Sequence, residues 1–142
     1  SQSLQTKARS TVPNYLTTDI LKNAIICPPD PESGACGVLD SEGQFVEFSR
    51  EFPRPRKPAP PPDPAILNGP LEHMPGCHLY AGWLRPHFGH MLVEATARLW
   101  AMDEMAADVQ SVLFIPSGPN TIWRARRQYR DLLELFTMGR EP

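Results

Sequence analysis

Two imidazoles, a carboxylate and a guanidinium fall close together between residues 86 and 100, and this cluster offers the chain's clearest chemistry. The four side chains are His87, His90, Glu94 and Arg98. At about 100° per residue, a helix would bring them within roughly 80° of one another. A helix with such a stripe beside its apolar face is suited to lining a cleft.

The spacing of this cluster favours general acid–base chemistry. His90 and Glu94 are four residues apart, so Glu94 can orient His90 and raise its basicity. Arg98, one turn further, would keep Glu94 ionised. A base held in this way can take a proton from a sugar or alcohol hydroxyl. The plainer alternative is an ordinary ion pair between Glu94 and Arg98, with the histidines capping the helix or half-buried.

A metal site is a further alternative for the same cluster. His87, His90 and Glu94 form a facial set that zinc or iron could use, although the spacing is not that of an established metalloenzyme motif. No serine or cysteine lies in a nucleophile-elbow pattern, which argues against acyl transfer. No glycine-rich phosphate loop of the Walker or dinucleotide type is present either.

The cluster should lie on a helix over residues 87–105. Pro86 suits the first helical turn, where a missing N–H does no harm. Apolar residues then recur at three- and four-residue steps and form one stripe, namely Phe88, Leu92, Ala95, Leu99 and Met102. Gly89 in the first turn costs about 1 kcal/mol relative to alanine. This cost suggests that a backbone or a ligand approaches closely there.

The elements around that helix predict an α/β fold. Residues 77–82 and the continuous apolar run 111–116 read as strands, and residues 121–137 as a second amphipathic helix. Asn120 is its expected N-cap and Gly139 its expected C′ residue. The buried side of this helix is expected to contain Ile122, Ala125, Tyr129, Leu132, Leu133 and Phe136. With connections this short, a parallel sheet with right-handed crossovers is the economical assembly, so residues 68–142 form a Rossmann-like block.

The first half of the chain is predicted to be simpler. Residues 1–52 comprise an N-terminal arm and a β-hairpin region. The arm covers residues 1–23, with one helical turn after Thr18-Asp19; a short strand at 23–27 and a β-hairpin over 37–48 follow. Residues 53–67 form a proline-rich linker, since seven of the 17 prolines lie between Pro53 and Pro64. We expect it to be strapped over the surface as a spacer; the alternative is a PxxP ligand for a proline-recognising domain.

Composition narrows the range of partners. The net charge is −2 and the pI is about 6.1, so no global attraction to nucleic acid is expected. No run of 18 apolar residues is present. The odd number of cysteines, three, and their wide spacing argue against a disulfide framework and favour a reducing compartment. The absence of a CxxC pair argues against a structural zinc site. Four late arginines, Arg124, Arg126, Arg127 and Arg130, read as a solvated helix face or as a contact for anionic lipid head groups or a phosphorylated acceptor.

One block of the chain resembles a known family. Leu79-Tyr80-Ala81-Gly82-Trp83, followed by His87-Phe88-Gly89-His90-Met91-Leu92-Val93-Glu94 and then by Arg98-Leu99-Trp100, resembles the N-terminal part of bacterial glycosyltransferase family 61 proteins. These are often labelled capsular polysaccharide biosynthesis proteins. The resemblance implies a GT-B-type N-terminal domain, on the acceptor side of an enzyme. That enzyme moves a sugar from a nucleotide-sugar donor to an acceptor hydroxyl, with inversion.

The resemblance also sets expectations for the site and the partners. It implies His87, His90, Glu94 and Arg98 as residues of the cleft. Our own hypothesis assigns His90 and Glu94 as catalytic residues and His87, Arg98 and Trp83 as substrate-binding residues, with no metal and no cofactor in this chain. The donor-binding C-terminal domain is missing, so this part alone is expected to be inactive. The resemblance further implies a glycan acceptor, no nucleic acid and a cytoplasmic location with peripheral inner-membrane contact; a homo-oligomer is also considered. Two readings stay open beside it: a non-catalytic α/β binding or assembly module, and the metal-dependent enzyme.

Overall fold

The protein is a small mixed α/β fold with short strands. The computed structural model describes residues 6–8, 18–54, 56–85, 102, 107–118 and 120–138. The chain divides into two compact units, Ser1–Leu71 and Glu72–Pro142, which are described separately below. Within the described ranges, no helix combines the length and the apolar character that a membrane span requires.

The described residues of the first unit form two small antiparallel sheets. One joins β1 (Thr6–Ala8) to β2 (Thr18–Ile20), and the other joins β3 (Ile25–Cys27) to β4 (Gly37–Leu39). The β3 strand fulfils the expectation for residues 23–27. The helical turn expected after Asp19 is wrong, because Asp19 lies within β2 and pairs with Lys7. Pairing with a distant segment overrides a local helical preference here.

The expected hairpin over residues 37–48 is confirmed in part. Leu39 bridges Phe45, and the Asp40 N–H donates to the Gln44 carbonyl at 2.9 Å, which closes the turn. Beyond it the chain forms a short 3₁₀ helix (Glu47–Ser49) instead of extending the second strand. Buried Ser49 explains the difference. Its Oγ accepts from the Val38 N–H at 2.8 Å and donates to the Val46 carbonyl at 2.6 Å. The Ser49 side chain thus takes the place of a backbone partner from a second strand.

The proline-rich segment is strapped onto this unit, as expected. The Ala59 N–H donates to the Glu51 carbonyl at 2.8 Å, and the Cys36 N–H donates to the Pro60 carbonyl at 3.1 Å. The Arg50 guanidinium also donates to the Ala59 carbonyl at 3.1 Å. Ala59 is only 2% exposed. A second 3₁₀ helix (Pro64–Asn68) follows and begins with Pro64, with Asp63 accepting from the Ala65 N–H.

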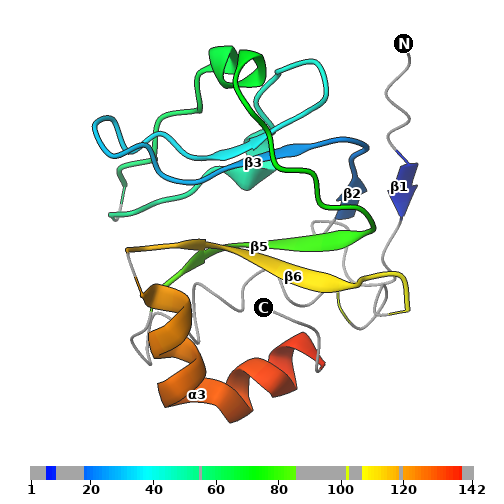
Figure 1. Cartoon of the computed structure of the whole chain (residues 1–142), viewed down its shortest axis with the longest axis vertical. Coiled ribbons are helices and arrows are strands. Elements are labelled where there is room, and N and C mark those ends of the chain that lie inside the picture. The colour runs from blue at the N-terminus through cyan, green and yellow to red at the C-terminus, as the bar shows by residue number, and fades with distance from the viewer. Residues whose placement is uncertain are drawn as a thin grey trace. The chain divides into compact units, whose positions relative to one another are not determined.

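Among its described residues, the second unit contains a pair of parallel strands followed by a helix. Strand β5 (His78–Leu84) pairs in parallel with β6 (Ser111–Pro116), and α3 (Thr121–Thr137) follows (Figure 1). The parallel pairing confirms that prediction, and β6 and α3 have the predicted bounds. The crossover segment, including the expected helix over 87–105, lies outside the described residues except for Met102, which is helical and 1% exposed.

Two apolar clusters hold this unit together. Met102 packs with Ala81, Val109 and Val112, and the partly buried Leu79 and Phe114 lie against them. The second cluster joins the end of β5 to the helix and consists of Leu84, Ala125, Phe114, Tyr129 and Leu132. Three residues expected on the buried side of α3, Ala125, Tyr129 and Leu132, therefore do pack there.

Helix α3 differs from the expectation at its start and in its middle. Asn120 occupies the N-cap position, as predicted, but it has left-handed backbone angles (φ 66°) and its side chain makes no capping hydrogen bond. N-capping side chains normally sit on an extended backbone. The Thr121 hydroxyl donates to the Gly118 carbonyl at 2.7 Å instead.

At Tyr129 the backbone of α3 leaves helical geometry (φ −134°, ψ 30°), and Figure 1 shows the resulting bend. Met138 ends the helix in a left-handed conformation, whereas Gly139 lies outside the described residues.

Candidate functional site

A bulge in β5 positions the first predicted site residue, Trp83. Tyr80 pairs with Leu113 and Gly82 pairs with Phe114, so Ala81 is an extra residue on the β5 side. Gly82 has φ +84°, a conformation that residues with a Cβ rarely adopt. Bulges of this kind re-aim the side chains that follow them and occur often beside active sites.

Trp83 carries a polar group without a hydrogen-bond partner among the described residues. The residue is half-buried, and its indole Nε1 is buried without a hydrogen-bond partner among the described residues. The Arg85 guanidinium carbon lies 5.7 Å from the centroid of its ring. A buried donor left unpaired costs about 1–3 kcal/mol, so a ligand that accepts this hydrogen bond would recover part of that energy.

The carboxyl ends of the two parallel strands meet at one edge of the sheet. Leu84 pairs with Pro116, and the Ser117 N–H donates to the Leu84 carbonyl at 3.2 Å. The Ser117 hydroxyl lies 3.4 Å from that of Thr121, the first residue of α3. Ligands of parallel α/β sheets bind beside such edges. Trp83 is at this edge, and the chain enters the predicted catalytic segment directly afterwards.

Four of the predicted site residues are not among those the structure describes. His87, His90, Glu94 and Arg98 lie in the range 86–101, outside the described residues, so their assignment stays a prediction. The predicted metal set of His87, His90 and Glu94 lies there too. The described ranges themselves contain no group of three histidine, cysteine or acidic side chains that could hold a metal ion.

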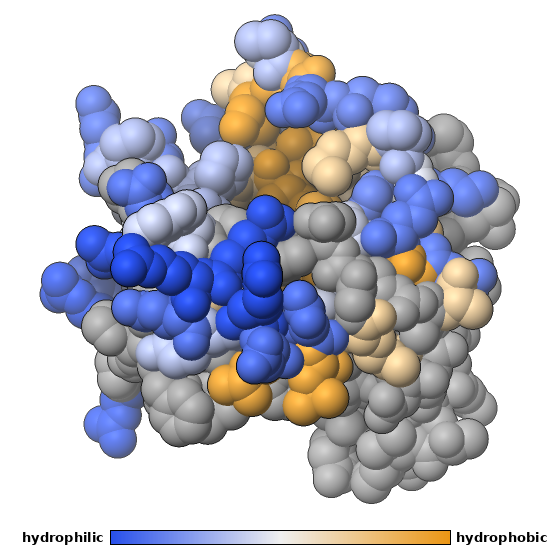
Figure 2. Space-filling model, turned by 60° about the horizontal axis from the view of Figure 1, so that its bottom comes forward, coloured by the Kyte–Doolittle hydropathy of each residue, from blue (hydrophilic) through white to orange (hydrophobic). Residues whose placement is uncertain are grey.

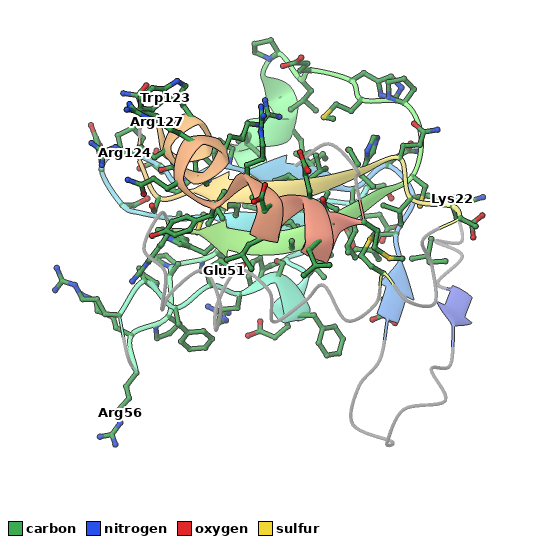
Figure 3. All side chains as sticks on the ribbon, turned by 90° about the horizontal axis from the view of Figure 1, so that it is seen from below. Lys22, Glu51, Arg56, Trp123, Arg124 and Arg127 are labelled. Atoms are coloured by element: carbon green, nitrogen blue, oxygen red, sulfur yellow. The ribbon has the colours of Figure 1, made fainter. Side chains whose placement is uncertain are left out.

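Helix α3 carries a second candidate site. Trp123 is 59% exposed, and the Arg127 guanidinium carbon lies 5.2 Å from the centroid of its ring. Together with Arg126 and Arg130 these residues line a hollow of about 370 Å³. Figure 2 shows a strongly hydrophilic patch on the side that carries α3, and Figure 3 shows Trp123, Arg124 and Arg127 gathered at the start of the helix.

Sequence reasoning identified the arginines of this hollow but not its tryptophan. The arginines stood out by their charge, whereas Trp123 was not assigned to any face of the helix. The signal that was available is the four-residue spacing between Trp123 and Arg127, which brings a guanidinium over an indole on a helix.

His78 and the two buried thiols have structural roles. Both ring nitrogens of His78 have hydrogen-bond partners, with Nδ1 2.6 Å from the Ser111 hydroxyl and Nε2 3.1 Å from the Pro75 carbonyl.

All three cysteines are free, and Cys27 and Cys36 are each 1% exposed. Burial raises the pKa of both thiols, and burial together with the nearby Glu51 raises the pKa of Cys36 to about 11. Neither is therefore a thiolate nucleophile at neutral pH.

Comparison with known proteins returned no relatives. No family model matches the chain, no curated protein matches it, and no solved structure matches it.

Proposed function

We propose that this chain is the N-terminal, acceptor-side part of a glycosyltransferase, with a Rossmann-like domain of the GT-B type in its second half. The support is the motif that runs from Leu79 to Trp100 together with one structural observation. A parallel pair of strands brings Trp83, with its unpaired buried indole N–H, to a carboxyl edge directly before that motif.

In the proposed reaction, an acceptor sugar hydroxyl attacks the anomeric carbon of a nucleotide sugar. His90, held by Glu94, accepts the hydroxyl proton as the new glycosidic bond forms and the nucleotide leaves on the opposite face. The Trp83 indole offers a flat apolar surface for the acceptor ring and a hydrogen-bond donor for one of its hydroxyls. His87 and Arg98 complete the acceptor site, and a further domain binds the donor.

The proposal includes a location. Free thiols at all three cysteines are in keeping with a reducing compartment, so we assign the protein to the cytoplasm, where it would make peripheral contact with the inner membrane and act in surface polysaccharide synthesis.

Acceptor binding can be tested on this chain alone. The protein would be titrated with a panel of mono- and oligosaccharides while the indole N–H resonances are followed by NMR. The Trp83 signal, identified with Trp83→Phe, should shift with at least one acceptor. Trp123→Phe serves as the control, because it leaves the β5 edge unchanged. A panel in which only the Trp123 signal moves would argue against an acceptor site at Trp83.

The catalytic assignment needs a protein that joins this chain to its donor-binding part. Sugar transfer by that protein should fall by at least about a hundredfold in His90→Ala and Glu94→Gln, since a positioned general base contributes roughly 10²–10⁴. The exposed His73 and Glu72 provide matched controls, His73→Ala and Glu72→Gln. Undiminished turnover in both site variants would remove these residues from the mechanism.

A second candidate function is assembly with a partner. Among the described residues, β5 and β6 form a sheet of only two strands, and such a sheet has edges that can pair with another chain. Gel filtration at several concentrations tests this candidate. A monomer at all concentrations that binds no hydrophobic dye would count against it, whereas self-association would support it.

A further inference from the structure

The hollow on α3 is formed by residues from the start and the middle of the helix. Trp123, Arg126 and Arg127 follow the spacing i, i+3 and i+4, which places them on one face. Arg130, just after the break at Tyr129, lines the same hollow. All four are exposed, and Figure 3 shows Trp123 and Arg127 side by side at the start of the helix. The hollow is open to solvent, so a ligand bound there would stay partly exposed.

Apart from Trp123, the side chains that line this hollow are all arginines. The first turn of α3 contains no acidic residue, and the two carboxylates of the helix, Asp131 and Glu134, come after the break at Tyr129. Within the described part of the chain, no carboxylate forms a salt bridge with Arg124, Arg127 or Arg130. Neighbouring guanidinium groups repel one another, and the positive end of the helix dipole adds to this repulsion. An anion would relieve both.

We propose that this hollow binds a phosphate-bearing ligand, a phosphomonoester or a diphosphate. Guanidinium groups bind phosphate oxygens through paired, charge-assisted hydrogen bonds, which a single carboxylate matches less fully because it carries less charge and fewer acceptors. The exposed ring of Trp123 supplies a flat surface for whatever group the phosphate carries. A soluble phosphorylated metabolite and a phospholipid head group share this chemistry. The proposal does not depend on glycosyl transfer, since none of its residues belongs to the predicted catalytic cluster.

The test uses two probes that separate these sources. The protein is titrated with sodium pyrophosphate in one arm, and with phosphatidylcholine vesicles that contain phosphatidic acid in the other. Pure phosphatidylcholine vesicles are the blank. Binding is read from the Trp123 indole N–H resonance for pyrophosphate and from co-sedimentation for the vesicles. Pyrophosphate binding identifies a soluble ligand, whereas binding to the acidic vesicles alone identifies a head group.

The variant Arg127→Gln/Arg130→Gln should weaken the binding by at least tenfold, because each charge-assisted contact contributes more than a tenfold change in affinity. The matched control is Arg54→Gln/Arg56→Gln, which removes two exposed arginines from the first unit; Arg56 extends into solvent in Figure 3. The control should bind as the wild type does. Thermal unfolding in pyrophosphate gives a second measure, with stabilisation of the wild type and of the control but not of the site variant.

Two results would overturn the proposal. One is the failure of both pyrophosphate and the acidic vesicles to bind the wild type. The other is an equal loss of binding in the control, which would show attraction to positive charge in general rather than to this hollow.

Discussion

The Nδ1 atom of His78 lies 2.6 Å from the hydroxyl oxygen of Ser111, so a side-chain hydrogen bond joins the first residues of β5 and β6. The backbone supports the same junction, since the Gln110 N–H donates to the Cys77 carbonyl at 2.8 Å. A parallel pair must be held together across a long connection, because no tight turn can join its strands. The two polar side chains therefore help to set the register in which β5 delivers Trp83 to the carboxyl edge.

We expect His78 and Ser111 to act as a unit in stability. His78→Ala and Ser111→Ala should each lower the free energy of unfolding by about 1–2 kcal/mol, and the double variant should lose less than the sum. Urea unfolding of the four proteins measures the coupling. Losses that add fully would mean that the contact contributes nothing of its own.

Gly82→Ala should disturb both stability and the candidate site. A residue with a Cβ at φ +84° costs about 1–2 kcal/mol, and relief of that strain would shift the bulge and move Trp83. The expected result is a lower unfolding midpoint together with a shifted Trp83 indole resonance. Gly118→Ala is the control, because a Cβ there meets nothing within 4 Å and Gly118 is not among the positive-φ glycines. Equal behaviour of the two variants would contradict a special role for Gly82.

Much of the second unit could be predicted from local pattern. The bounds of β6 follow from its continuous apolar run, which is typical of a strand buried on both faces. The bounds of α3 follow from its amphipathic repeat, which is typical of a helix buried along one stripe. The bulge at Ala81 could not be predicted in this way, since it depends on how β5 meets its partner. The break at Tyr129 could not be predicted either, because no proline or glycine in the helix indicates it.

The first unit and the candidate sites show the same limit. The pairing of Thr18–Ile20 with Thr6–Ala8 and the placement of Ser49 both depend on contacts between distant segments. Trp83 could be selected because it ends a recognisable strand beside a reactive cluster. Trp123 could not be assigned to a site from the sequence, because its role depends on the contact between its ring and the Arg127 guanidinium.

Ser49→Ala should destabilise the first unit. The Ser49 hydroxyl accepts from the Val38 N–H and donates to the Val46 carbonyl, and the residue is 2% exposed. Without it the Val38 N–H is left buried without this partner, at a cost of about 1–3 kcal/mol. Chemical unfolding measures the loss, and Ser41→Ala, in the exposed turn, is the control and should change little. A Ser49 variant as stable as the control would show that water or another group replaces the hydroxyl.

Stability should fall at alkaline pH because of Cys36. Its buried thiol has a pKa of about 11 in the folded protein, against 9.0 as the reference, owing first to burial and then to Glu51 and Cys27. Between these pH values the thiol has lost its proton in the unfolded chain but keeps it in the folded protein. Unfolding therefore becomes more favourable as the pH rises. The contribution is fully present below pH 9.0 and is lost as the pH rises to about 11.

Cys36→Ala isolates this effect from other alkaline titrations. The decline of the unfolding free energy between the two pKa values should be shallower in Cys36→Ala than in the wild type, whereas Ser41→Ala, which removes no titratable group, should retain the wild-type slope. Urea unfolding in reducing buffer at several alkaline pH values measures the difference. Identical slopes in all three proteins would mean that the Cys36 thiol ionises as readily in the folded state as in the unfolded chain.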